Sequence, residues 1–348
     1  MRRVEQVVRA VDRWQQRRTV PAFVLAVMKK FGDDNAGSLS ANLAFAAFGA
    51  IFPLLLLLVT LLGLVLAGDP SLRQQVLNSA LSEFPIIGGR LGSNIHALKA
   101  RSTPALTLAI LGLVWSSMSL SQAGLFTMAQ VWNLPGPQRP NYVHRLLRSV
   151  GFLAVMGAGL IVTTALASFG TLSSETEYAV GAEGLALLVN IGQYVLAFRV
   201  LTPQAVGTRK LLPGAAIGGA AWTLLQALGS FLVAHELRGA SEVYGTFAIV
   251  IGLMAWVFLG VRVSVYGAEI NTVIDRHLWP RSIVQPPLTK ADRTSLSLQA
   301  EQNQRRPEQK VSVSFLEGPD HPDEDSRLPN VSGDRGDDAA ASFVRKRG

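Results

Sequence analysis

Six long apolar runs decide what this chain can fold into, because each is close to the length that a membrane-crossing helix needs. A helix requires ~20 mostly apolar residues to cross the ~30 Å hydrocarbon core of a bilayer. The six runs contain few or no charged residues. The sequence therefore predicts an all-α, polytopic membrane protein with six transmembrane helices, at about 39–67, 104–131, 146–170, 182–200, 211–234 and 245–274.

The composition agrees with a membrane domain and excludes several kinds of site. The chain of 348 residues is 49% hydrophobic and 16% charged, whereas soluble domains are about 25% charged. It has no cysteine, so disulfides, iron–sulfur clusters and cysteine-ligated zinc are excluded. Its five histidines lack the close spacing of metal sites. No Ser-His-Asp or GxxxxGK[ST] pattern occurs, and we expect no catalytic residue, metal or other cofactor.

The distribution of Lys and Arg between the loops predicts the orientation of the helices. Short cytoplasmic loops are enriched in these residues. They are frequent before the first run and in the second and fourth loops, and the third loop, 171–180, has none. The first loop departs from this trend, with Arg73, Arg90, Lys99 and Arg101. The balance predicts an inner (plasma) membrane protein with both termini in the cytoplasm.

Two segments flank the membrane domain, which is predicted to cover 39–280. Residues 1–38 form a basic, cytoplasmic segment, and an amphipathic pattern is indicated by Val4, Val7, Val8, Val11 and Trp14. This helix either lies on the inner membrane surface or is solvated, and both alternatives stay open. Residues 285–348 contain few large apolar residues, so we predict a disordered cytoplasmic tail. Its balanced charges argue against a nucleic-acid partner.

Four segments carry a resemblance to a known family. They are FGDDNAGSLSANLAFAAFGAIFPLLLL (31–57), RKLLPGAAIGGAAW (209–222), VYGTFAIVIGLMAW (243–256) and VYGAEIN (265–271). In this order and spacing, the chain resembles the YihY/BrkB family of inner-membrane proteins, once labelled ribonuclease BN. The resemblance implies six transmembrane helices, cytoplasmic termini, and a transport or lipid-handling role. The chain departs from the family pattern at Phe45-Ala46-Ala47-Phe48 and at Arg262.

The old ribonuclease label conflicts with the residues that are present. A metal-dependent ribonuclease needs a dense cluster of His and Asp side chains. No HxHxDH-like segment occurs in this sequence. We therefore predict that the protein is neither a ribonuclease nor another enzyme.

The sixth run contains the main candidate polar site. Arg262 and Glu269 project from nearly the same helix face, ~10.5 Å apart along the axis, with Tyr266 between them. A charged side chain inside the bilayer needs a partner or a wet cavity. We therefore predict that Arg262 has one, and that Glu269 has a basic partner among Arg145, Arg209, Lys210 and Arg262. Either a structural clamp or a transport or proton pathway would explain these residues.

Other runs add polar and helix-breaking residues to the candidate site. In the second run, WSSMSLSQ places several polar residues in mid-helix, which predicts a cavity wall, although such residues also join helices. Pro53 predicts a kink in the first run. The fifth run has a small-residue face at Gly214 and Gly218, which predicts close helix packing. The polar candidates are Asn42, Ser116, Ser117, Gln122 and Asn271.

Two functions are compatible with these features. The first is a transporter or a lipid-handling, envelope-integrity protein, with membrane lipid and a small-molecule or lipid substrate as partners. The alternative is a non-transporting scaffold that recruits partners through its N-terminal helix and its C-terminal tail. Small residues on several runs would permit a homo-oligomer. The sequence names no substrate.

Overall fold

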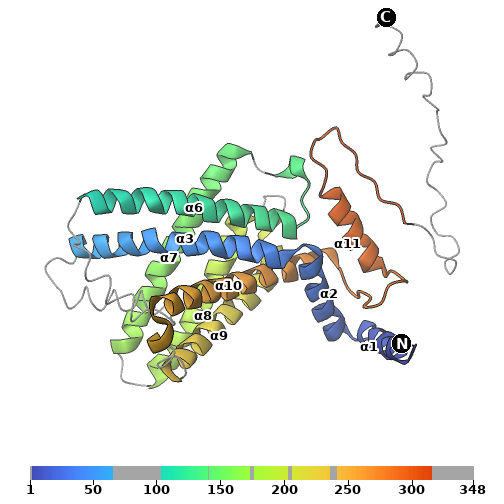
Figure 1. The fold of residues 1–348 in the computed structure, drawn as a ribbon, viewed down its shortest axis with the longest axis horizontal. Helices are drawn as coiled ribbons and strands as arrows, with labels where there is room; N and C mark the ends of the chain where they lie inside the picture. The colour runs from blue at the N-terminus through green and yellow to red at the C-terminus, as the bar shows by residue number, and fades with distance from the viewer. Residues whose placement is uncertain are drawn as a thin grey trace, which may run out of the picture. The chain divides into compact units, whose positions relative to one another are not determined.

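The computed structural model describes residues 2–65, 103–139, 141–172, 176–202, 206–235 and 241–315. The chain divides into two compact units, Met1–Val313 and Ser314–Gly348. All assigned helices lie in the first unit, and no strand occurs in the described ranges (Figure 1). The helices are α1 Arg2–Gln16, α2 Thr19–Asp33, α3 Ala36–Val65, α6 Thr103–Val131, α7 Tyr142–Leu172, α8 Thr176–Leu201, α9 Leu212–His235, α10 Ser241–Arg276 and α11 Lys290–Glu301.

Each of the six apolar runs coincides with one long helix, whose bounds differ from the predicted ones by a few residues, and residues 66–67 of the first run lie outside the described residues. Within the described part of the chain, five helices are long and apolar enough to cross a membrane. These candidate spans lie in or around α3, α7, α8, α9 and α10, at Ala36–Pro53, Tyr142–Thr163, Gly184–Leu201, Thr208–Gly229 and Val250–Arg276. By length and composition, such a set of helices is consistent with a multi-pass membrane protein.

The six long helices form a closed ring of packing neighbours. α3 packs against α6, α6 against α7, α7 against α8, α8 against α9, α9 against α10, and α10 against α3. Figure 1 shows α3 and α6 running side by side. Near one end of the ring, a buried apolar core joins α2, α6, α8 and α10 through Phe31, Met128, Phe198 and Val265. This core fixes the helix ends that carry the charged residues.

α9 and α10 cross in backbone contact, as the small-residue face predicts. A Cβ atom added to Gly214 would lie 1.8 Å from the carbonyl oxygen of Gly267, so only glycine fits there. Asn271 locks the crossing, because its Oδ1 accepts a hydrogen bond from the Gly214 N–H (2.7 Å) and its Nδ2 donates to the Leu211 carbonyl (3.1 Å). Gly218 packs against the side-chain ring of Tyr194 of α8, which a Cβ atom added to Gly218 would approach to 2.9 Å. The prediction of close packing on this face is confirmed.

Three helices end near the same pole of the ring with a residue in the left-handed region. Asn35 (φ 51°) follows α2, Asn133 (φ 47°) follows α6, and His277 (φ 53°) follows α10. Residues such as Asn tolerate this conformation better than most. After α6 and α10, the Leu134 N–H bonds to the Ala129 carbonyl (2.9 Å) and the Leu278 N–H to the Val273 carbonyl (3.1 Å). These bonds satisfy helix-terminal carbonyls as in a Schellman motif.

The segment after α10 is more ordered than its composition predicts. α11 begins with a capping box, in which the Thr289 hydroxyl accepts from the Asp292 N–H and the Asp292 carboxylate accepts from the Thr289 N–H. Ala291, Asp292 and Ser295 of this helix are buried. The prediction of a disordered tail over 285–348 is therefore wrong for residues 290–301, which form α11. The remainder of the predicted tail, 316–348, lies outside the described residues.

Candidate functional site

Three ionisable side chains meet at the pole of the ring, and we call them the buried charge cluster: Lys30, Asp34 and Glu269. Lys30 lies in the last turn of α2, Asp34 caps that helix, and Glu269 comes from α10. Lys30 Nζ lies 3.5 Å from Glu269 Oε2 and also forms an ion pair with Asp34. It donates a hydrogen bond to the carbonyl of Val131, the last residue of α6 (2.9 Å). The ammonium thus sits where the dipole of α6 favours a cation.

The buried charge cluster contains one more acidic group than basic group. Lys30 and Glu269 are both 0% exposed. Neither carboxylate oxygen of Glu269 has a hydrogen-bond partner in the described structure, although the Lys30 ion pair is close. Burial raises the pKa of Asp34 above its usual range, against the opposing effects of Lys30 and Asn133. A cluster with a surplus acid and an unsatisfied carboxylate can take up a proton or a hydrogen-bond donor.

The sequence correctly predicts that Glu269 needs a basic partner but names the wrong cations. Lys30 is the partner, and among the described ion pairs none joins Glu269 to Arg145, Arg209, Lys210 or Arg262. Lys210 instead pairs with Asp275 at 2.7 Å.

Arg262 lies apart from the buried charge cluster and is exposed. Its guanidinium stands 5.5 Å from the ring centre of Phe31 and 5.9 Å from that of Tyr266. Those two rings stack on each other with centres 4.1 Å apart. The partner of Arg262 is therefore an aromatic pair rather than a carboxylate, and such cation–π contacts are weaker than a buried ion pair. Tyr266 packs in this stack and does not join Arg262 to Glu269.

The other predicted site residues are dispersed over the ring. Asn271 acts at the α9–α10 crossing, and Asn42 is exposed on α3. Ser116 and Ser117 are buried in α6, where the Ser116 hydroxyl donates to the Leu113 carbonyl of the same helix. Gln122 accepts a hydrogen bond from Arg145 of α7. The predicted cavity wall in α6 thus includes contacts that join helices.

Pro53 lies inside α3, which continues on both sides of it. A Cβ atom added to Gly112 of α6 would be 3.3 Å from Pro53 Cβ, so the proline ring packs closely against α6 at that point. The kink that Pro53 predicts stays a prediction.

A polar pocket of about 410 Å³ lies beside the buried charge cluster. Asp34 belongs to both, because it lines the pocket and pairs with Lys30. The pocket is formed by the α2–α3 corner, by the end of α6 with the segment after it, and by α11 with the segment after it. Burial of the Arg139 guanidinium lowers its pKa, and the positive charge of the nearby Arg145 lowers it further. Its lining includes Asp33, Asp34, Gln130, Arg139, Gln302 and Arg305.

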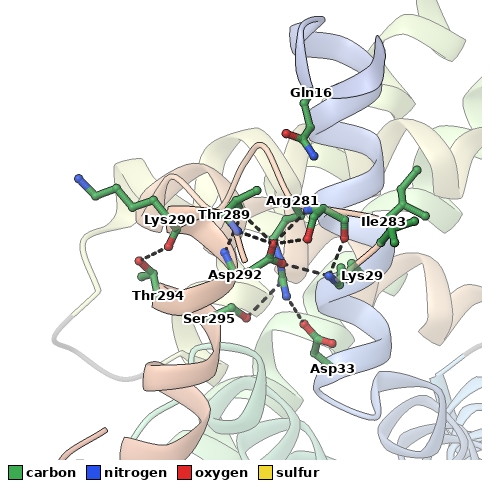
Figure 2. A network of polar contacts seen from close by, with 12 residues as sticks. Gln16, Lys29, Asp33, Arg281, Ile283, Thr289, Lys290, Asp292, Thr294 and Ser295 are labelled. Carbon is green, nitrogen blue, oxygen red and sulfur yellow. Dashed lines mark hydrogen bonds and ion pairs between the residues drawn. The ribbon is translucent and has the colours of Figure 1, made fainter. Parts of the chain in front are cut away.

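A second network fastens the C-terminal segment to α2, and we call Lys29, Asp33, Arg281 and Asp292 the clasp (Figure 2). Arg281 is bonded at 2.7 Å both to Asp33 of α2 and to Asp292 of α11. Lys29 Nζ lies 3.0 Å from Asp292 Oδ1. Figure 2 shows these side chains converging from α2 and α11 on Arg281. The clasp therefore holds α11 against the helix that leads into α3.

Asp292 is the most heavily bonded carboxylate of the clasp. Burial opposes its charge, but hydrogen bonds from the Ser282 N–H, Arg281 and Thr289 outweigh that effect and hold the pKa of Asp292 well below its usual range. A carboxyl group whose folded pKa is depressed stabilises the fold above its unfolded pKa, and this contribution is lost as the pH falls through the folded pKa.

Replacement of Asp292 by asparagine should loosen α11. The substitution removes the charge that Arg281 and Lys29 share, at a cost of about 2–3 kcal/mol. Hydrogen exchange at neutral pH should show lower protection of Lys290–Glu301, and a Glu301→Gln variant, which changes an exposed carboxylate of the same helix, should behave as the wild type. The stability difference between Asp292→Asn and wild type should shrink as the pH falls below about 4. A difference that grows with acidity would contradict the assigned role.

Sequence reasoning missed Lys30, Asp34 and the clasp. The signal that could have found α11 is the Thr289-Lys290-Ala291-Asp292 pattern, which resembles a capping box ahead of a short helix.

Comparisons with known proteins agree on one family. The family model described as virulence factor BrkB matches residues 27–288. The match includes Lys30, Asp34, Glu269 and Arg281, and it ends before Asp292. No solved structure matches the chain.

Individual relatives are distant and differ in length. A UPF0761 membrane protein of Alcanivorax borkumensis is 24% identical over 263 residues, which are 72% of this chain and 60% of that protein. A UPF0761 membrane protein of Pseudomonas aeruginosa is 25% identical over 280 residues, 74% of this chain and 64% of that protein. The ribonuclease-like protein YfkH of Bacillus subtilis is 23% identical over 270 residues, 73% of this chain and 96% of that protein. The chain thus spans less than two thirds of the first two relatives.

The names of these relatives point to a membrane location and to no agreed chemistry. The UPF0761 names state only that the proteins are membrane proteins. The ribonuclease-like name belongs to the Bacillus protein. Among the described residues of this chain, no group of three or more His, Asp or Glu side chains could hold a metal ion.

Proposed function

The chain belongs to the virulence factor BrkB family, and from this premise we propose that it is a plasma-membrane transporter or lipid-handling protein with six membrane-spanning helices. In this proposal the buried charge cluster and the polar pocket face the cytoplasm. The ligand is a small polar solute or the headgroup of a lipid.

α6 supports a sixth span beside the five helices that qualify by length and hydropathy. It is a helix of 29 residues, Thr103–Val131, without a charged side chain. Most of its described exposed residues are large and apolar, with Leu108 66% and Trp115 80% exposed. Exposed apolar faces of this kind fit hydrocarbon better than water. With an even number of spans, the segments before the first span and after the last span lie on the same side of the membrane. The N-terminal helices and α11 do lie at the same pole of the ring.

The observation that carries the proposal is that the pocket and the buried charge cluster share Asp34. A ligand in the pocket changes the electrostatic environment of Asp34. Lys30 transmits that change to Glu269 of α10, because it pairs with both carboxylates. Ionisable groups buried in a membrane domain commonly mark pathways for protons, ions or substrates.

The test is reconstitution of the purified full chain into liposomes, with flux assays for small polar solutes and for fluorescent lipids. At least one class should move faster than in protein-free liposomes. Absence of any acceleration over the whole screen would contradict the proposed function.

The role of the cluster is tested with Glu269→Gln in the same liposomes. The fold should persist, because Lys30 keeps Asp34 as its partner and the surplus acid is removed. The rate should fall at least roughly tenfold, the effect of losing ~1.4 kcal/mol of electrostatic coupling. Glu301→Gln, at an exposed carboxylate of α11, should leave the rate unchanged. Equal rates for the wild type, Glu269→Gln and Glu301→Gln would show that the buried charge cluster takes no part in transport.

The alternative, a scaffold that recruits partners through its ends, needs a truncation at a suitable place. A chain that stops near Pro287 would lose Asp292 and so would break the clasp. A chain that stops after Val313 keeps the first unit and removes only the second. Under the transport proposal, the chain that ends at Val313 should keep the full flux of the intact protein. Loss of a cellular phenotype with intact flux would favour the scaffold.

A further inference from the structure

The two N-terminal helices each present an uncovered apolar stripe. On α1, Val7, Val11 and Trp14 are 62%, 48% and 52% exposed. At 100° per residue these three side chains fall within an arc of about 60°. On α2 the exposed residues recur every fourth position, with Val20, Val24 and Met28 at 73%, 50% and 60%. Exposed apolar side chains gathered on one helix face in this way indicate a site of interaction.

The stripe on α1 is held outward by hydrogen bonds on another face of the helix. Asp12 accepts from the Ile283 N–H at 2.9 Å, and Gln15 Nε2 donates to the Arg281 carbonyl at 2.7 Å. Burial opposes the charge of Asp12, but the hydrogen bonds from Ile283, Gln15 and Gln16 outweigh it and lower its pKa. Because this face is fastened to the segment after α10, α1 cannot turn its apolar stripe inward without breaking those bonds.

Arginines border the stripe on α1. Arg13 and Arg17 are exposed; by helical spacing Arg13 lies about 130° from the centre of the stripe, and Arg17 directly follows the last residue of α1. Arg18 is also exposed, and its guanidinium stands 5.4 Å from the ring centre of Trp14. An apolar stripe with Trp and a basic border is the pattern of a helix that lies in a membrane interface.

The position of these helices in the chain favours lipid over a protein partner. α2 meets α3 at the corner formed by Asp34 and Asn35, and the first candidate span, Ala36–Pro53, begins there. In Figure 1, α2 runs across the end of α3 rather than continuing it. A helix that turns away where a span begins lies near the level of the lipid headgroups.

We propose that α1 and α2 together dock on an anionic lipid surface, with Val7, Val11 and Trp14 in the headgroup region and the arginines on lipid phosphates. The inference is independent of whether the protein transports anything. The C-terminal segment takes part indirectly, because it orients α1.

The absence of cysteine from the whole chain permits a direct test. A single Val11→Cys substitution in the full-length protein is labelled with the environment-sensitive dye NBD, and the protein is placed in nanodiscs. The emission should be blue-shifted and more intense in phosphatidylcholine mixed with phosphatidylglycerol than in phosphatidylcholine alone. High salt should weaken the shift, since exposed charges are screened.

A matched label and a charge variant complete the experiment. Lys290→Cys, at an exposed position of α11, should give emission that does not depend on the lipid. Arg13→Gln and Arg17→Gln in the Val11→Cys protein should each raise the anionic lipid needed for half of the shift, by roughly fivefold in affinity per arginine. Emission from Val11→Cys that is the same in both lipids, or that responds only to an added protein, would overturn the proposal.

Discussion

Replacement of Gly214 by alanine is expected to prevent α9 and α10 from packing. The added Cβ would lie 1.8 Å from the Gly267 carbonyl oxygen and 2.7 Å from the Asn271 side chain. The oxygen belongs to the backbone of α10, so relief requires separation of the two helices and loss of the Asn271 hydrogen bonds. We expect a destabilisation above about 4 kcal/mol, at the upper end of overpacking effects.

The measurement is thermal unfolding of the purified protein in detergent, monitored by the fraction that stays monodisperse. Gly192→Ala is the matched control, because nothing lies within 4 Å of its added Cβ. In α8 that substitution should be neutral or stabilising by up to about 1 kcal/mol, since alanine is the better helix former. Equal unfolding temperatures for the two variants would contradict the close crossing of α9 and α10.

Replacement of Lys30 by methionine should have the second large effect. It leaves Asp34 and Glu269 without their shared cation, and Lys30 and Glu269 are 0% exposed. Removal of one partner from a buried ion pair typically costs 3–5 kcal/mol. Lys29→Met is the control, because Asp292 keeps its bond to Arg281 and Lys29 is 25% exposed at its side chain. The control should cost about 1 kcal/mol or less.

A compensating variant separates charge from packing. Lys30→Met combined with Asp34→Asn and Glu269→Gln removes the uncompensated carboxylates and should recover much of the lost stability in the same thermal assay. If the triple variant is no more stable than Lys30→Met alone, the aliphatic part of Lys30 rather than its charge is what the fold requires.

The long helices could be predicted from sequence because each is a local pattern. The run around IFPLLLLLVTLLGLVLA needs only length and hydropathy to be recognised as a helix. The crossing at Gly214 was predictable for a similar reason, since small residues one turn apart let a neighbouring helix approach. Both signals are contained in a few turns of one helix.

The polar contacts could not be predicted because they join distant parts of the chain. The position of Glu269 predicted a basic partner, and its own helix and the neighbouring loops contain four candidate cations. The actual partner, Lys30, comes from the N-terminal segment. α11 was missed because its mean composition is polar, and its order depends on Arg281 and Asp33 rather than on an apolar face of its own. The aromatic partner of Arg262 could not be predicted, because a stack of rings leaves no charge pattern in the sequence.

The clasp also sets the order in which the protein can be completed during synthesis. Asp292 follows Lys29 by 263 residues, so at 5–20 residues per second Lys29 waits roughly 10–50 seconds for its partner. Glu269 likewise emerges long after Lys30. The nascent chain must therefore carry Lys29 without Asp292, and Lys30 with Asp34 but without Glu269, through the insertion of every intervening helix. α1 can be fastened only when the last part of the membrane domain has been made. The clasp, which joins α2 to the segment after α10, can thus form only at the end of synthesis of the first unit.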